Sequence, residues 1–369
     1  MKVLKAQSTK TNAKEAVLEL KEKFNSNSAV KAITFFASSN YNSTELISAM
    51  NENFPNIQVF GCSTSGEVIS GCMCSNSIVA MAFTDEVIED MKIEVVENLN
   101  NFDLMPAIHS FENHFKTRLN KMSEDKYFGL IYLDGLSKKE EAILDELGDY
   151  TQVMFVGGSA GDDLKFKQTV IYANGKCYDN SAVLVLVKSK IGFGFEKLQS
   201  FVPTEHTVTA TKVDVANRII YEFDGKPATE VYAKLLNTTV ADVSKVFGEY
   251  TLGLMIGDEP YVRSIQQIVE KDALMLYCNV KEGMKLKILK TTDMIVDTKK
   301  FVDDIKKKYN SISGMLIFNC ILRYLELQNK NQVQDYADIF SDIPTVGFCT
   351  YGEAYIGHIN QTATFLVLE

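Results

Sequence analysis

One short phrase of glycine, hydroxyl and acidic residues occurs three times in this chain, each time after an apolar stretch. The copies run over residues 59–67, 155–163 and 346–353. The first and third align without a gap, and the shared residues are Gly61, Thr64, Gly66, Glu67 and Gly71, matched by Gly347, Thr350, Gly352, Glu353 and Gly357. The middle copy is one residue shorter and ends in Asp162. This repetition predicts a protein built from a recurring strand and loop unit.

Each copy has the composition of an apolar strand that runs into a tight turn. Glycine in such a turn permits positive φ and lets a ligand or a second backbone approach closely. For any single copy an ordinary loop is the simpler interpretation, because clusters of glycine, serine and threonine usually mark loops. Three copies favour loops that converge, because ligand sites form preferentially at junctions between structural units. We therefore expect a ligand pocket where the three loops meet.

A polar ligand such as an amino acid requires donors for its carboxylate and an acid for its ammonium group. Loop N–H groups and hydroxyls supply the donors, and carboxylates supply the acid. The candidate ligand-binding residues are Gly61, Cys62, Ser63, Thr64, Glu67, Gly158, Ser159, Asp162, Thr350, Tyr351 and Glu353. On this hypothesis, alanine in place of Glu67 or Glu353 weakens ligand binding and leaves the fold intact.

Charge and hydropathy exclude several classes of protein. The formal net charge of −10, from 48 acidic and 38 basic residues, disfavours nucleic acid and anionic membranes as partners. No apolar run reaches the roughly 18 residues that a membrane helix needs, and the first residues lack the apolar stretch of a secretory signal. The sequence predicts a cytoplasmic protein.

The cysteines suggest a reducing compartment. There are seven, an odd number spread over the chain, which does not fit a disulfide framework. Cys62, Cys72 and Cys74 lie close together, but Cys72 and Cys74 are separated by one residue where zinc sites usually have two or more. We expect these cysteines to be buried or half-buried thiols, and no metal site is predicted.

The order of predicted elements points to an α+β protein with two related halves, in which mixed or antiparallel sheets are flanked by helices. After an amphipathic helix over residues 11–25, strand-helix-strand patterns cover residues 30–60, 127–156 and 314–347, and each continues into extended chain. The predicted domains are an N-terminal extension over residues 1–29, a first sensory domain over 30–222 and a second domain over 223–369.

The order of these motifs resembles the FIST family, bacterial sensory proteins made of a FIST N and a FIST C domain. The resemblance covers nearly the whole chain from about residue 30. The resemblance rests on the loop over residues 61–67, the loop over 157–162 with Thr169 and Asn174-Gly175, the segment from Thr209 to Ala228, and residues 347–353 with Asn360-Gln361-Thr362.

The resemblance implies a sensory protein that binds a small ligand and signals to a partner. In the family these domains accompany kinase, chemotaxis-receptor and cyclic-dinucleotide domains. We expect no such domain to be fused to this chain, and the expected partner is a separately encoded histidine kinase or cyclic-dinucleotide enzyme.

Some family members resemble haem-binding nitric-oxide sensors, which makes haem an alternative ligand. Haem requires an axial ligand such as histidine, and the candidates are His206 and His358. His109 and His114 lie on the polar side of a helix predicted over residues 102–122, and we expect both to be exposed to solvent.

A hydrolase is a second alternative, with Ser159 or Cys62 as nucleophile. Residues 157–161 fit the Gly-x-Ser-x-Gly pattern, but that motif requires a helix directly after the serine, and here an extended segment follows. Cys62 needs a histidine base that the sequence does not assign. We therefore expect a protein without catalytic activity.

Overall fold

The computed structural model describes residues 2–24 and 29–369 and divides the chain into two compact units. Residue 25 of the predicted first helix and residues 1 and 25–28 of the predicted N-terminal extension lie outside the described residues. The first unit contains Met1–Leu198, Thr298–His358 and Ala363–Glu369, and the second contains Gln199–Asp297 and Ile359–Thr362. The predicted boundary between residues 222 and 223 falls within a strand of the second unit.

Three six-stranded sheets form the first unit, and equivalent strands occupy equivalent positions in all three. The first sheet is β1 (Val3–Ser8), β6 (Ile78–Thr84), β2 (Val30–Ser38), β3 (Gln58–Thr64), β10 (Ile171–Ala173) and β11 (Lys176–Tyr178). The second is β7 (Ile88–Glu97), β12 (Ser181–Ser189), β8 (Tyr127–Leu133), β9 (Phe155–Ser159), β24 (Glu353–Ala354) and β25 (His358–Ile359). The third is β13 (Phe193–Gln199), β26 (Thr362–Leu368), β22 (Gly314–Cys320), β23 (Thr345–Thr350), β4 (Glu67–Ile69) and β5 (Cys72–Cys74).

A parallel pair lies in the middle of each sheet and comes from one strand-helix-strand unit. The pairs are β2 with β3, β8 with β9, and β22 with β23. Their connections contain α2 (Ser43–Asn53) in the first, α4 (Glu140–Tyr150) in the second, and α7 (Ile321–Asn329) with α8 (Val333–Asp338) in the third. A helix is the usual connection because parallel strands need a crossover of a dozen residues or more. The predicted α+β fold, built from repeated units and mixed sheets, is confirmed.

After each parallel pair the chain leaves its own sheet and adds a hairpin to another. The hairpin β4–β5 joins the third sheet through β23, β24–β25 joins the second through β9, and β10–β11 joins the first through β3. The three exchanges form a closed cycle. No repeat therefore completes its own sheet.

The core of the first unit shows the same threefold relation. Phe36, Tyr132 and Phe318 each follow the residue that pairs with the motif glycine of the neighbouring strand. Their ring centroids lie 5.3 Å apart for Phe36 and Tyr132, 6.3 Å for Phe36 and Phe318, and 6.0 Å for Tyr132 and Phe318. All three side chains are buried. Aromatic contacts of this kind add to the hydrophobic stabilisation from burial.

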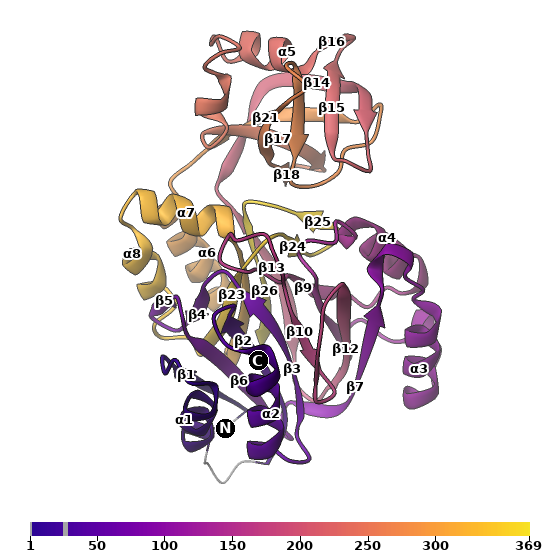
Figure 1. Ribbon diagram of the computed structural model, residues 1–369, viewed down its shortest axis with the longest axis vertical. Coiled ribbons are helices and arrows are strands. Elements are labelled where there is room, and N and C mark those ends of the chain that lie inside the picture. The colour runs from indigo at the N-terminus through magenta and orange to yellow at the C-terminus, as the bar shows by residue number, and fades with distance from the viewer. Residues whose placement is uncertain (1, 25–28) are drawn as a thin grey trace. The chain divides into compact units, whose positions relative to one another are not determined.

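The remaining helices of the first unit cover its outer surfaces. They include α1 (Ala13–Phe24), which packs beside α2 (Figure 1), and α3 (Met105–Phe115). The helix predicted over residues 102–122 is shorter because Lys116 takes a left-handed conformation, φ 54°, and ends α3. His109 and His114 are exposed, as expected. Among the described residues, no helix has both the length and the apolar character that crossing a membrane requires.

The second unit is a small α+β module around one eight-stranded sheet. Its strands are β14 (Phe201–Asp214), β15 (Ile219–Phe223), β16 (Lys226–Pro227), β17 (Tyr250–Ile256), β18 (Glu259–Arg263), β19 (Ile265–Val269), β20 (Ala273–Leu276) and β21 (Lys285–Thr291). Its helix α5 (Ala228–Leu235) buries Tyr232 in an apolar core with Val208 and Leu252. The helix α6 (Met294–Lys308) begins in this unit and ends in the first.

Two of the cysteines are not free thiols, contrary to expectation. Cys72 and Cys74 form a disulfide within β5, an edge strand of the third sheet. Residues two apart on a strand point to the same face, and the two Cα atoms lie 5.9 Å apart, within the range that a disulfide spans.

Candidate functional site

The three motif loops meet, and their backbones are hydrogen-bonded in a cycle. The N–H of Gly161 donates to the carbonyl of Ser63 at 3.0 Å, and that of Tyr351 donates to the carbonyl of Ser159 at 3.1 Å. The N–H of Ser65 closes the cycle on the carbonyl of Cys349 at 3.4 Å. In each loop the acceptor is two residues and the donor four residues after the first motif glycine. We call residues 61–67, 157–163 and 347–353 the loop hub.

The first glycine of each loop is required by close backbone packing. A Cβ atom on Gly61 would lie 1.9 Å from the carbonyl oxygen of Phe35. The corresponding distances are 1.8 Å for Gly157 and Ile131, and 1.8 Å for Gly347 and Ile317. Steric exclusion therefore explains the repeated glycine.

The first and third loops place a buried glutamate against a buried threonine. Thr64 Oγ1 donates to Glu67 Oε1, and Thr350 Oγ1 donates to Glu353 Oε1 at 2.6 Å. Glu67 also accepts from the N–H and hydroxyl of Ser77, at 3.1 and 2.7 Å. Burial raises the pKa of Glu67 to about 7, although these hydrogen bonds favour the charged form.

In the middle loop Asp162 connects two copies of the motif. The hydroxyl of Tyr351 donates to Asp162 Oδ1 at 2.5 Å, and three backbone N–H groups also donate to this carboxylate, those of Phe166, Lys167 and Gln168. Burial by itself raises the pKa of Asp162, but the hydrogen bonds from Tyr351 and the backbone outweigh it and lower the pKa overall.

The structure brings the predicted ligand residues together but gives their side chains partners within the protein. Of this set only Tyr351 is half-exposed, and the others are buried. Ser63 Oγ donates to the carbonyl of Gly161 at 2.8 Å, and a Cβ atom on Gly158 would lie 2.7 Å from Thr350 Cγ2. Ligand binding by the loop hub stays a prediction. The expectation that alanine at Glu67 leaves the fold intact must change, because Thr64 and Ser77 would lose their acceptor.

The two histidines proposed for haem do not fit that role. His206 lies on β14 in the second unit, with its side chain one-third exposed beside Glu205. His358 is buried in the first unit, where its ring packs so closely on Gly352 that a Cβ atom there would lie 2.0 Å from His358 Cε1. Neither histidine lines either of the cavities described below, so no haem chemistry is derived from them.

Of the two candidate nucleophiles, Ser159 is hydrogen-bonded within the protein and Cys62 is buried. Ser159 Oγ donates to Glu140 Oε1 at 3.1 Å, and the residues after Ser159 lead to β10 and not into a helix. Cys62 is fully buried, which raises the pKa of its thiol. Burial of the thiol keeps it protonated and removes it from substrate.

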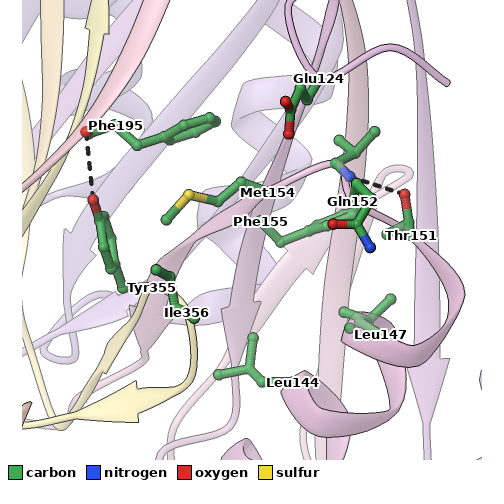
Figure 2. A pocket seen from close by; sticks show the side chains of 12 residues that line it. Glu124, Leu144, Leu147, Thr151, Gln152, Met154, Phe155, Phe195, Tyr355 and Ile356 are labelled. Carbon is green, nitrogen blue, oxygen red and sulfur yellow. Dashed lines mark hydrogen bonds between the residues drawn. The ribbon is translucent and has the colours of Figure 1, made fainter. Parts of the chain in front are cut away.

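A cavity of about 500 Å³ lies in the first unit, between the segment that leads into β9 and the turn after β24 (Figure 2). Most of its lining is apolar and comes from α4, the segment that leads into β9, β13 and the turn after β24. The lining residues are Glu124, Leu144, Leu147, Gly148, Thr151, Gln152, Val153, Met154, Phe155, Phe195, Tyr355 and Ile356. Its volume falls within the range of sites for small molecules.

The polar groups of this cavity belong to a few residues at its edge. Glu124 and Gln152 are exposed, and Tyr355 donates to the carbonyl of Phe195 at 3.4 Å. Ile356 is 69% exposed, and Figure 2 shows Met154 pointing toward Tyr355 and Ile356. An exposed isoleucine beside an apolar cavity leaves hydrophobic surface for a ligand to cover.

Two strands connect the cavity to the loop hub. Phe155 lines the cavity and begins β9, which reaches the hub at Gly157. Tyr355 directly follows β24, in which Glu353 pairs with Gly158. A ligand that displaces Phe155 or Tyr355 would therefore act on strands that carry two of the three loops.

A second cavity, of about 430 Å³, is more polar and lies at the start of α2. Its lining residues are Asn42, Ser43, Thr44, Glu97, Gln168, Val170, Cys177, Tyr178 and Asp179. None of the predicted ligand residues lines either cavity. Of the residues around the first cavity, only Phe155 belongs to one of the three motif copies.

Comparison with known proteins gives two matches to family models. The model of the FIST N domain matches residues 31–226, and the model of the FIST C domain matches residues 228–355. Among curated proteins, this chain is similar to an uncharacterized protein of Methanocaldococcus jannaschii, with 23% identity over 292 residues. The match covers 74% of this chain and 56% of the relative, so the chain spans little more than half of that protein's length.

Proposed function

This chain belongs to the FIST family, whose domains are sensory signalling domains, and we propose that it binds a small ligand in the cavity beside the loop hub. The observation that carries the proposal is an apolar cavity of about 500 Å³ joined by β9 and β24 to two of the three motif loops. The ligand does not undergo reaction, and the partner that receives the signal is a separate histidine kinase or cyclic-dinucleotide enzyme.

The lining favours a ligand with an apolar body and an ammonium group. Leu144, Leu147 and Phe155 offer apolar contact, and burial of apolar area contributes about 25 cal/mol per Å². The carboxylate of Glu124 suits an ammonium group, and the amide of Gln152 suits a carboxylate. An amino acid with an apolar side chain, or the corresponding amine, has these features.

Signal transfer follows from the backbone connections. The loop hub is closely packed, so a shift of β9 or β24 has to be accommodated by the other loops through their cyclic hydrogen bonds. Packed interiors change between discrete arrangements more readily than they deform continuously. The hub therefore couples the cavity to all three sheets of the first unit.

Binding is tested by calorimetry with phenylalanine, leucine and phenylethylamine as probes. We expect Met154→Trp, which fills the cavity, to weaken binding of all three at least about tenfold, equivalent to about 1.4 kcal/mol. Glu124→Gln should also weaken binding of all three, because each probe carries an ammonium group. A probe without a charged nitrogen, phenylpropionate, should not respond to Glu124→Gln.

Ser43→Ala in the second cavity serves as the matched control and should leave binding unchanged. If the probes bind the Met154→Trp and native proteins equally, or bind neither, the proposed site is wrong. Loss of binding in Ser43→Ala alone would move the site to the polar cavity.

A further inference from the structure

The cysteine pair on β5 is placed where small molecules reach it. Cys72 and Cys74 are both half-exposed, and β5 is an edge strand of its sheet. Of the other five cysteines, Cys62, Cys278, Cys320 and Cys349 are buried and Cys177 is half-exposed. Thiol chemistry depends on access to sulfur. The Cys72–Cys74 disulfide therefore combines a bonded pair with access from solvent.

The two sulfur atoms have different surroundings. Gln7 Nε2, from β1, donates a hydrogen bond to Cys74 Sγ at 2.9 Å. A donor aimed at sulfur stabilises negative charge that develops there, and a sulfur that carries charge more easily is the better leaving group. The arrangement favours attack on Cys72 with Cys74 as the leaving sulfur.

We propose that Cys72 and Cys74 form a dithiol–disulfide exchange site for small-molecule thiols of the glutathione class, with Cys74 as the leaving sulfur. The inference is independent of the ligand cavity. A thiolate attacks Cys72 Sγ, the bond between the two protein sulfurs breaks, and its electron pair goes to Cys74 Sγ, which takes up a proton. A second thiolate attacks the small molecule's sulfur in the mixed disulfide and releases Cys72. In total, two thiols are oxidised to one disulfide, and the protein disulfide is reduced to two thiols.

The site adjoins the loop hub through the backbone. In the β4–β5 hairpin Glu67 pairs with Cys74 and Ile69 pairs with Cys72. β4 also pairs with β23, which leads to the third loop. The exchange reaction therefore takes place on a hairpin that begins at the hub carboxylate Glu67.

The proposal is tested by counting free thiols in the full chain after equilibration with mixtures of reduced and oxidised glutathione. Cys177→Ser is the background, because it removes the other half-exposed thiol and leaves six of the seven cysteines. After acid quenching, unfolding and alkylation, intact mass should show four alkylated cysteines at the oxidising limit and six at the reducing limit. Six at every ratio, or four even in excess thiol, would overturn the exchange site.

The leaving sulfur is tested by the rate of reduction. Gln7→Leu removes the donor to Cys74 and should lower the second-order rate constant for reduction by glutathione by roughly three- to tenfold. Thermal unfolding of the same variant establishes that it is folded. An unchanged rate in a folded variant would refute Cys74 as the leaving sulfur.

Discussion

Glu67 is a buried carboxyl group whose burial makes the stability of this protein depend on pH. Its pKa is raised to about 7 from an ordinary 4.5, mainly because burial disfavours the charged form. The folded protein therefore keeps this proton over a range in which the unfolded chain releases it. Stability from this group is fully present below about pH 4.5 and is lost as pH rises to about 7.

Glutamine at position 67 should remove this pH dependence. Where the folded state binds one proton more than the unfolded state, the free energy of unfolding falls by about 1.4 kcal/mol per pH unit. Between about pH 4.5 and pH 7 the native protein should therefore lose about 3 kcal/mol of stability relative to Glu67→Gln. Urea unfolding at pH 5, 6 and 7 measures the difference. Asp162→Asn is the control, because the lowered pKa of Asp162 places its effect on the acid side, below about pH 4. Parallel stability curves for native protein and Glu67→Gln would contradict the prediction.

The first glycine of each motif loop should tolerate no side chain. Gly347→Ala places a Cβ atom 1.8 Å from the carbonyl oxygen of Ile317, and we expect a loss of at least about 3 kcal/mol, as for other severely strained core sites. Gly148→Ala is the matched control, since among the described residues a Cβ atom there would meet nothing within 4 Å beyond its own turn of α4. Alanine also favours helix over glycine by about 0.5–1 kcal/mol. Urea denaturation compares the two, and similar effects of both substitutions would disprove the packing argument.

At the scale of elements, the exchanged hairpins are the feature that sequence could not predict. Glycine, threonine and glutamate recur visibly in the first and third copies because these two loops meet the same local constraint. Outside its own hairpin, by contrast, β4 pairs with β23, where Ile69 lies opposite Val346, 277 residues later in the chain. Local periodicity carries no information on which sheet a hairpin joins. The same limit applies to α3, whose end depends on one left-handed residue, Lys116.

Tyr351 is the side chain that joins the third loop to the second. Its hydroxyl should contribute more to the free energy of unfolding than the hydroxyl of an average tyrosine does. Besides donating to Asp162, this hydroxyl accepts from the N–H of Leu164 at 2.8 Å. Tyr351→Phe should cost about 2–3 kcal/mol, because hydrogen bonds to charged groups are the stronger ones. It should also move acid unfolding to higher pH, since Asp162 loses a donor that lowers its pKa.

Tyr41→Phe is the control for this measurement. Tyr41 donates one hydrogen bond, at 2.6 Å, to the carbonyl of Lys10, outside the loop hub. Urea and acid titrations of both variants separate the two effects. If Tyr351→Phe costs no more than Tyr41→Phe and leaves the acid transition in place, the hub does not depend on this contact.

At the scale of the whole molecule, the sequence predicted the repeated units and the meeting of their loops, but not the cavity. Loop convergence followed from repetition, whereas burial of Glu67 and Thr350 depends on contacts made only in the folded first unit. The cavity is lined by residues such as Glu124, Phe195 and Tyr355, which come from distant segments and share no pattern. The sequence did not predict the division of the chain into two units either, because the first unit is discontinuous and resumes at Thr298 after the second.

The most direct test of ligand binding beside the loop hub is an NMR titration of methyl groups with phenylalanine. We expect the methyl signals of Leu144, Leu147, Met154 and Ile356 to shift first, with one dissociation constant that matches calorimetry. Methyl groups at the second cavity, such as those of Val170, should not shift at the same concentrations. Shifts confined to Val170, or no shifts while calorimetry records binding, would contradict a ligand site beside the loop hub.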